Sequence, residues 1–200
     1  MNDLHLALHG LAIKKHAAAK DVAGVVGLDP AHAESLLRQA VTSGRCVEVQ
    51  QAFMLSPSGR MILEGQYSRL YDDVRADRAF LQANDRFERI NTELKQLVTD
   101  WQVMEVGGQK VRNDHSNADY DARILDRLGD LHERFTPVLN ALAQAVPRLR
   151  IHLQKLEHAL ERAEAGATEW VSDAKIESYH TVWFEMHEDL LRIVGRERAE

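Results

Sequence analysis

Apolar residues recur at spacings of three and four through the first 44 residues and predict three helices. The first is expected from about Asp3 to Lys15, with Asp3 as its cap. The second is expected from about Ala18 to Val26 and stops at Gly27, where a left-handed backbone has no steric cost. The third begins at Asp29-Pro30, an N-cap carboxylate followed by a proline at the first helical position, and it runs to about Ser43.

Two short runs of β-forming residues come next, and they predict a small hairpin. These runs are Cys46–Val49 and Phe53–Leu55, on either side of Gln50-Gln51. Beyond Gly65 the pattern becomes helical again, with one polar loop at residues 105–117. The expected helices span residues 67–103, 118–145, 148–165 and 173–194. Asp77 and Asn84 interrupt the apolar seam of the first of these helices, so we expect it to bend or to meet polar partners there.

The predicted fold class is mainly α, in two domains. Residues 1–66 are expected to form an N-terminal winged helix-turn-helix domain, because two helices joined by Gly-Leu-Asp-Pro precede the hairpin. Residues 67–200 are expected to form a four-helix C-terminal region for dimerisation and sensing.

The segment that leaves the predicted wing is Leu55-Ser56-Pro57-Ser58-Gly59-Arg60. It resembles the Leu-Ser/Thr-x-x-Gly-Arg sequence at the same place in the winged-helix domain of MarR-type regulators. The resemblance covers residues 4 to 66, about a third of the chain. It implies a dimeric transcriptional regulator that binds DNA.

If the third helix docks in the major groove, its outward side chains meet base edges and nearby basic residues reach phosphates. The expected base-reading residues are His32, Ser35, Arg38 and Gln39. The expected phosphate contacts are Lys14, Lys15, Lys20 and Arg45. Arg38 is the one strong base reader of the set, while Glu34 at the same end of the helix would be repelled by phosphate.

The charge of the chain does not favour nucleic acid. The formal net charge is −6, and residues 1–66 carry six basic and six acidic side chains. DNA binding with so little positive charge would require two winged helices acting together. Alternatively, the winged helix serves as a protein-docking or dimerisation module.

Cysteine content and hydropathy indicate a cytoplasmic protein that does not enter a membrane. Cys46 is the single cysteine, so neither an intramolecular disulfide nor a cysteine-based metal site is expected. The N-terminus lacks a signal-peptide pattern, and no apolar run approaches the roughly 18 residues of a membrane span.

The C-terminal region contains His180 and His187, which project from one helical face with Trp183 between them. A rise of roughly 10 Å separates them, which makes it hard for both to bind one metal ion. Both imidazoles could be core residues with hydrogen-bonded partners. Alternatively, a pocket for a small anion or aromatic molecule is formed by Asp114, His115, Tyr179, His180, Trp183 and His187.

A catalytic role is not expected for this chain. It lacks a glycine-rich phosphate loop, a Gly-x-Ser-x-Gly sequence and a His-Glu-x-x-His sequence, and no cofactor is implied. Glu185, Glu188 and Asp189 near His187 could form an acid/base cluster, but a solvated helix face explains them better.

Most of residues 66 to 195 resembles a helical domain found mainly in actinobacterial proteins, some of which stand alone as MarR-like regulators. The resemblance is carried by residues 99–102, 113–121 and 178–191. Similar regions are attached to enzymes like the phosphoenolpyruvate-utilising family. Two hypotheses follow. The first is a MarR-like homodimeric regulator with a small-molecule effector, and the second is a non-catalytic accessory subunit of a phosphoenolpyruvate-synthase-like phosphotransferase.

Overall fold

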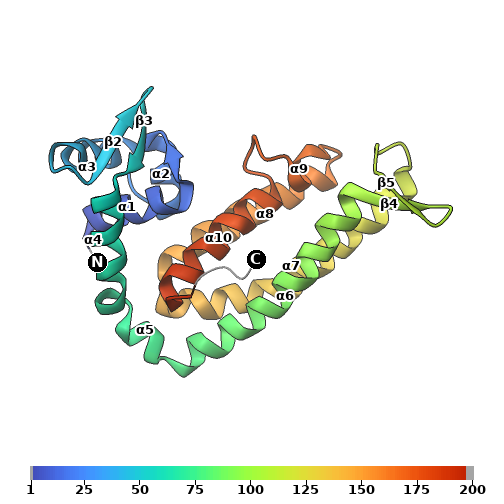
Figure 1. The fold of residues 1–200 in the computed structure, drawn as a ribbon. Coiled ribbons are helices and arrows are strands. Elements are labelled where there is room, and N and C mark those ends of the chain that lie inside the picture. The colour runs from blue at the N-terminus through green and yellow to red at the C-terminus, as the bar shows by residue number, and fades with distance from the viewer. Residues whose placement is uncertain (1, 197–200) are drawn as a thin grey trace. The chain divides into compact units, whose positions relative to one another are not determined.

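The computed structural model describes residues 2–196, which divide into two compact units (Figure 1). The first unit contains residues 2–77 and 185–196, and the second contains residues 78–184. Both are mainly helical, as predicted, and each has a small sheet. The domain boundary expected at residue 66 lies within a helix, and the last helix, α10 (Tyr179–Val194), contributes to both units.

The first unit follows the predicted order of three helices and a hairpin, with one additional strand. Its remaining elements are α1 (Asp3–Lys14), β1 (His16–Ala17), α2 (Ala19–Val26), α3 (Pro30–Thr42), β2 (Cys46–Val49), β3 (Ala52–Leu55), α4 (Pro57–Leu70) and α5 (Asp72–Ala76). The sheet order is β1-β3-β2, and both pairings are antiparallel. Strand β1 was not predicted, because two residues are too few to show an alternating pattern.

The ends of these helices show local capping chemistry. Asp29 accepts a hydrogen bond from the backbone of His32, and Pro30 occupies the first position of α3, as predicted. Gly27 ends α2 in the left-handed conformation, with φ of 76°. The cap expected at Asp3 is wrong, because Asn2 caps α1 by accepting a hydrogen bond from the backbone of His5.

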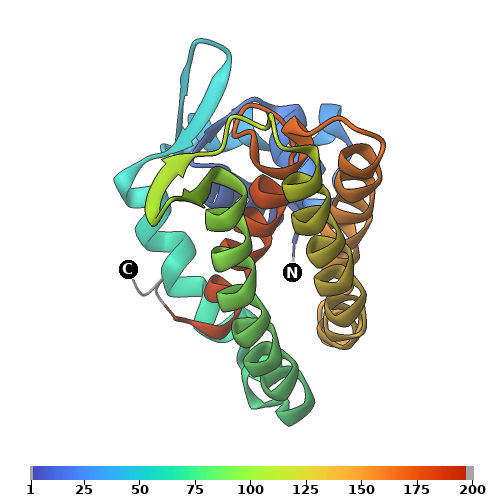
Figure 2. The ribbon, with the colours of Figure 1, turned by 90° about the vertical axis from the view of Figure 1, so that its right-hand side faces the viewer.

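The β2–β3 hairpin turns at Gln50 and Gln51, whose φ angles are 51° and 64°. Two consecutive left-handed residues give a tight turn that matches the twist of the strands. The register pairs Val47 with Met54 and Glu48 with Phe53. Figure 2 shows the hairpin extending from the body of its own unit.

Helix α1 is the centre of the first unit. Its buried residues lie on more than the single predicted face, and they are His5, Ala7, Leu8, His9, Gly10, Leu11 and Ile13. Helices α2, α3 and α4 all contact α1, and Arg192 of α10 donates to the backbone oxygen of Ala12. The stripe expected from local periodicity is therefore incomplete, since elements distant in sequence cover the rest of the helix.

The second unit is built on two long helices, α6 (Arg78–Gln102) and α7 (Ala118–Ala145), which lie side by side (Figures 1 and 2). Its other elements are β4 (Val103–Val106), β5 (Gln109–Arg112), the 3-10 helix η1 (Pro147–Leu149), α8 (Arg150–Glu164), α9 (Glu169–Ser172) and the first turns of α10. The start and end predicted for α7 are confirmed. The core contains Phe87, Phe135 and Trp183 in mutual contact.

Three expectations for this half of the chain are wrong. The helix expected at residues 67–103 is divided among α4, α5 and α6, with breaks at Tyr71 and Asp77. The break at Asp77 lies where a bend was expected, whereas Asn84 is buried within the unbroken α6. Residues 103–112 form a hairpin, β4–β5, rather than the start of a loop. Helix α10 begins at Tyr179 rather than after Ser172, because residues 173–178 form turns.

No helix in residues 2–196 has the length and apolar character needed to cross a membrane.

Candidate functional site

The outward face of α3 and the neighbouring β2–β3 hairpin form an exposed surface in the first unit, called here the α3–hairpin surface. The four expected base-reading residues are all exposed on α3, and they are His32, Ser35, Arg38 and Gln39. The buried residues of α3 are Ala33, Leu37 and Ala40. Helical spacing therefore predicted correctly which side of α3 meets the core.

Two carboxylates bind Arg38 at this surface. Its guanidinium donates to Glu34 at 2.9 Å and to Glu48 of β2 at 3.3 Å. The hydrogen bond that Arg38 donates to Glu34 and the negative charge of Glu48 raise the pKa of Arg38. The Arg38 side chain remains 58% exposed, and exposed ion pairs contribute little to stability. A phosphate or a base edge can therefore compete for the guanidinium.

The expected phosphate-contacting residues do not form one group. Lys14 is paired with Glu185, and the two side chains are 17% and 7% exposed, so this cation is largely removed from solvent. Lys15 ends α1 in an unusual backbone conformation with φ of 67°, and Lys20 is exposed on α2. Arg45 is half-buried immediately before β2. The surface consequently has little positive charge to attract DNA.

One face of the hairpin is apolar and exposed. Val47, Val49 and Met54 are 44%, 47% and 39% exposed, and Met54 lies directly opposite Val47 in the register. The other face includes Cys46 and Phe53, which are buried. Burial raises the pKa of the Cys46 thiol to about 11, which keeps it protonated at neutral pH.

The segment that leaves the hairpin, residues 55–60, contains a Ser-x-x-Gly sequence that fixes α4 to the segment before β2. The Ser56 side chain accepts a hydrogen bond from the backbone of Gly59 and donates to the backbone oxygen of Gly44 at 2.7 Å. A Cβ atom at Gly59 would lie 1.9 Å from the backbone oxygen of Arg45. This position therefore requires glycine for close packing rather than for an unusual φ.

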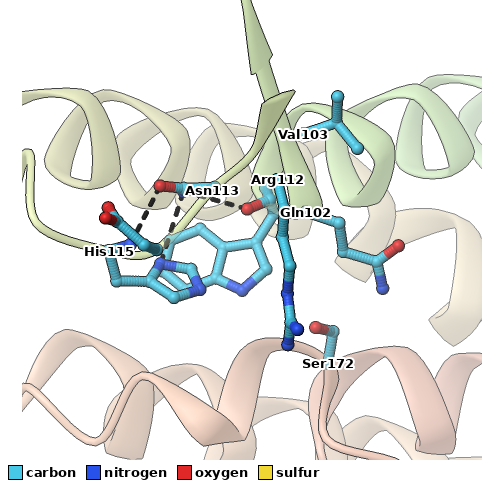
Figure 3. A pocket seen from close by; sticks show the side chains of 8 residues that line it. Gln102, Val103, Arg112, Asn113, His115 and Ser172 are labelled. Atoms are coloured by element: carbon cyan, nitrogen blue, oxygen red, sulfur yellow. Dashed lines mark hydrogen bonds between the residues drawn. The ribbon is translucent and has the colours of Figure 1, made fainter. Parts of the chain in front are cut away.

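A second candidate site is a pocket of about 780 Å³ at the base of the β4–β5 hairpin in the second unit, called here the hairpin-base pocket (Figure 3). It is lined by Trp101, Gln102, Val103, Arg112, Asn113, Asp114, His115 and Ser172. Helix α6, strand β5, the following turn and α9 thus all contribute to it.

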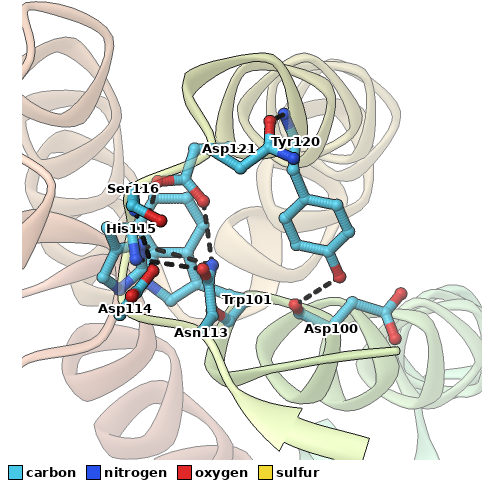
Figure 4. A network of polar contacts seen from close by, with 9 residues as sticks. Asp100, Trp101, Asn113, Asp114, His115, Ser116, Tyr120 and Asp121 are labelled. Atoms are coloured by element: carbon cyan, nitrogen blue, oxygen red, sulfur yellow. Dashed lines mark hydrogen bonds and ion pairs between the residues drawn. The ribbon is translucent and has the colours of Figure 1, made fainter. Parts of the chain in front are cut away.

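His115 is held in this pocket by a network of polar contacts (Figure 4). Its Nδ1 lies 2.9 Å from a carboxylate oxygen of Asp121, and its ring centroid lies 4.6 Å from that of Trp101. The Asn113 side chain donates to the other oxygen of Asp121 at 2.8 Å and to the backbone oxygen of Trp101 at 3.0 Å. The backbone of His115 has φ of 60°, which few non-glycine residues adopt.

The structure does not bring all six expected ligand-binding residues together. Asp114 and His115 line the hairpin-base pocket. Tyr179 and Trp183 are buried in the core of the second unit, His180 is half-buried, and His187 is buried in the part of α10 that belongs to the first unit. The reading of these residues as one pocket is therefore corrected, because α10 buries its aromatic side chains instead of presenting them to a cavity.

Tyr179 and Trp183 have core partners. Trp183 donates from its indole nitrogen to Asn91 at 3.0 Å, and the Tyr179 hydroxyl lies 3.2 Å from Nδ1 of His132. Burial raises the pKa of Tyr179 and lowers that of His132, so both side chains remain neutral at physiological pH.

Sequence reasoning missed Trp101, Arg112 and Asp121 as parts of a site. The available signal is the polar run at residues 113–121, which contains the expected Asp114 and His115. The hairpin that places Arg112 beside this run was not predicted. Asp121 was inside a predicted helix, where an acidic residue in the first turn is ordinary.

The acidic residues near the end of α10 are not a solvated face, contrary to expectation. Asp189 is fully buried and lies 2.9 Å from Nε2 of His9, whose Nδ1 lies 2.9 Å from the Tyr67 hydroxyl. Glu185 is buried with Lys14. These pairs lie in the core of the first unit and hold α10 against α1.

Within residues 2–196, no group of three or more histidine, cysteine or acidic side chains is arranged to hold a metal ion. Comparisons with protein families, with curated proteins and with solved structures give no match for this chain.

Proposed function

We propose that the chain is a MarR-like transcriptional regulator that binds DNA as a homodimer. The observation that carries the proposal is the exposed polar face of α3 beside an exposed two-stranded hairpin, in the order helix, strand, helix, helix, strand, strand. We interpret residues 2–66 as a winged helix on this basis. A helix enters the major groove with such a face toward the base edges, and a hairpin beside it reaches the backbone.

In this proposal, Arg38 reads a base and exchanges its contacts with Glu34 and Glu48 for a guanine edge. A bidentate arginine–guanine pair discriminates by about 1–3 kcal/mol against other bases. Few phosphate contacts are available to each copy, since Lys14 is paired with Glu185. Useful affinity therefore requires two copies on adjacent half-sites.

The proposal is tested by selecting genomic fragments with the full chain and measuring affinity by fluorescence anisotropy. Arg38→Ala should weaken binding to the selected site by about tenfold to a hundredfold, as expected for loss of a base-specific pair. Arg69→Ala, which removes an exposed arginine from the last turn of α4, is the matched control and should bind like the wild type. Equal losses in the two variants would contradict base reading by α3.

A second function is favoured by the apolar face of the hairpin. Val47, Val49 and Met54 offer a DNA backbone no hydrogen bond, but they suit a protein partner. In this case the α3–hairpin surface would dock a phosphoenolpyruvate-synthase-like phosphotransferase, with the chain as a non-catalytic accessory subunit.

An adjacent phosphotransferase gene would make this second function testable by co-purification. Replacing Val47 and Val49 with lysine should abolish co-elution, because burying two unpaired charges opposes docking. The same changes should preserve or strengthen DNA binding. Separate elution of the unmodified proteins would count against the accessory role.

A further inference from the structure

The hairpin-base pocket contains a cation that is suited to an anionic ligand. Arg112, at the end of β5, has no hydrogen bond or ion pair with another residue in the described part of the chain. Its side chain extends across the pocket and ends beside Ser172 of α9 (Figure 3). A guanidinium in this position can make two parallel hydrogen bonds to a carboxylate.

The opposite part of the lining contains a histidine in a fixed orientation. Nδ1 of His115 lies 2.9 Å from the Asp121 carboxylate, a hydrogen-bond acceptor, and 3.3 Å from the Asn113 amide nitrogen, a donor. We assign the proton to Nδ1 because the contact with the carboxylate is the shorter one. A neutral His115 therefore has an acceptor at Nε2. The backbone at φ of 60° and the contact with the tilted ring of Trp101 restrict the imidazole further. Such a histidine selects a ligand that donates a hydrogen bond.

A third residue restricts the charge of the ligand. Asp114 also lines the pocket, and its hydrogen bonds with the side chain and backbone of Ser116 lower its pKa, so it remains ionised. This negative charge opposes a phosphate dianion more than a carboxylate. The lining of the pocket thus favours a ligand that carries a single negative charge.

We propose that the hairpin-base pocket binds a small hydroxy carboxylate, with its carboxylate on Arg112 and its hydroxyl donating to Nε2 of His115. Asn113 and Asp121 act as positioning residues, because they hold the imidazole ring. The role of this ligand as an effector rests on the proposed regulatory function, but its binding does not.

Binding is measured by calorimetry on the full chain without DNA, in a buffer that contains no carboxylate or phosphate. The probes are mandelate, mandelamide, phenylacetate and inorganic phosphate. Mandelate should bind best. Mandelamide lacks the charge and phenylacetate lacks the hydroxyl. Each should bind at least about tenfold more weakly than mandelate, because each loses one hydrogen bond to a charged or buried group. Phosphate should bind more weakly than mandelate.

Two variants assign these preferences to residues. Arg112→Gln should remove the preference for mandelate over mandelamide, whereas Lys110→Gln removes the same charge from the same strand and should preserve it. His115→Asn should remove the preference for mandelate over phenylacetate. Asparagine tolerates the left-handed backbone at this position, so the variant keeps the local fold.

Three results would overturn the proposal. They are failure of mandelate to bind, equal affinities for mandelate and mandelamide, and equal effects of Arg112→Gln and Lys110→Gln. Since DNA is absent from the assay, these results are independent of failure to bind DNA. Ligand binding without any effect on DNA affinity would instead contradict the regulatory function alone.

Discussion

Gly59 shows how one residue can determine the packing of a whole element. Its hydrogen atom faces the backbone of Arg45, and the first turn of α4 can approach the start of β2 only because no Cβ intervenes. In the sequence, this glycine belongs to the segment at residues 55–60 that resembles a MarR-type motif. The physical reason for it, a backbone contact between residues 14 positions apart, could not be read from spacing alone.

We predict that Gly59→Ala destabilises the protein by about 1–3 kcal/mol, the usual cost of overpacking, because the methyl group would displace the Arg45 backbone. Gly65→Ala in the same helix is the control, since a Cβ there meets no atom within 4 Å. The control should raise stability by about 0.5–1 kcal/mol. Urea unfolding of both variants measures the difference, and a neutral Gly59→Ala would disprove the close packing.

Other residues show what local patterns leave undetermined. The seven-residue spacing of His180 and His187 suggested a common pocket that α10 does not form, because His187 is buried and His180 is half-buried. No sequence pattern marks His9, yet it is a fully buried polar residue that is hydrogen-bonded to Tyr67 and Asp189. Its partners lie 58 and 180 residues away, and no local pattern predicts such pairs.

At the scale of elements, predictions succeeded where the ends of a helix carry their own signal. Asp29-Pro30 begins α3 and Gly27 ends α2, as expected. Predictions failed where tertiary contacts, rather than local sequence, determine where a helix begins or ends. Arg75 donates to the backbone oxygens of Arg192 and Ile193 and thereby holds the short helix α5 to the end of α10. The local sequence reads as one long helix and carries no sign of this contact with residues about 117 positions away.

The β4–β5 hairpin illustrates a second limit. Gly107 and Gly108 both have positive φ and form a tight turn, and a paired glycine between short apolar–polar runs is a recognised hairpin signal. The loop expected at residues 105–117 covers this turn, and the structure shows two short strands with mostly exposed side chains instead. That error concealed the hairpin-base pocket.

Helix α10 should depend on the buried polar contacts of Asp189 and Glu185 for its place in the first unit. We predict that Asp189→Ala lowers the free energy of unfolding by about 3–5 kcal/mol, because it leaves a buried histidine without its charged partner. The exposed Asp126→Ala in α7 should change stability by less than about 0.5 kcal/mol. Thermal and urea unfolding test this, and similar stabilities of the two variants would show that the pair contributes no net stabilisation.

At the scale of the whole molecule, two compact units share one helix. The first unit contains the α3–hairpin surface and the last turns of α10, and the second contains the hairpin-base pocket and the first turns of α10. Ser172 lines the pocket, and the backbone oxygen of Asp173 accepts a hydrogen bond from Thr181 in α10. A ligand that orders Ser172 would therefore act close to the beginning of the shared helix.

Charge is the whole-molecule property that most challenges DNA binding. The chain has a formal net charge of −6, and the cations near the α3–hairpin surface are few. If Lys15, Lys20 and Arg45 each contact one phosphate in both copies of a dimer, about six counterions are released, and the slope of log affinity against log salt should be about −5.

A salt titration of the full chain with its selected genomic fragment tests whether the chain binds DNA as a dimer. We predict saturable binding at low salt, a slope of about −5 and a stoichiometry of two chains per site. No detectable binding to any fragment at low salt would contradict the account and leave the α3–hairpin surface as a site for protein contacts.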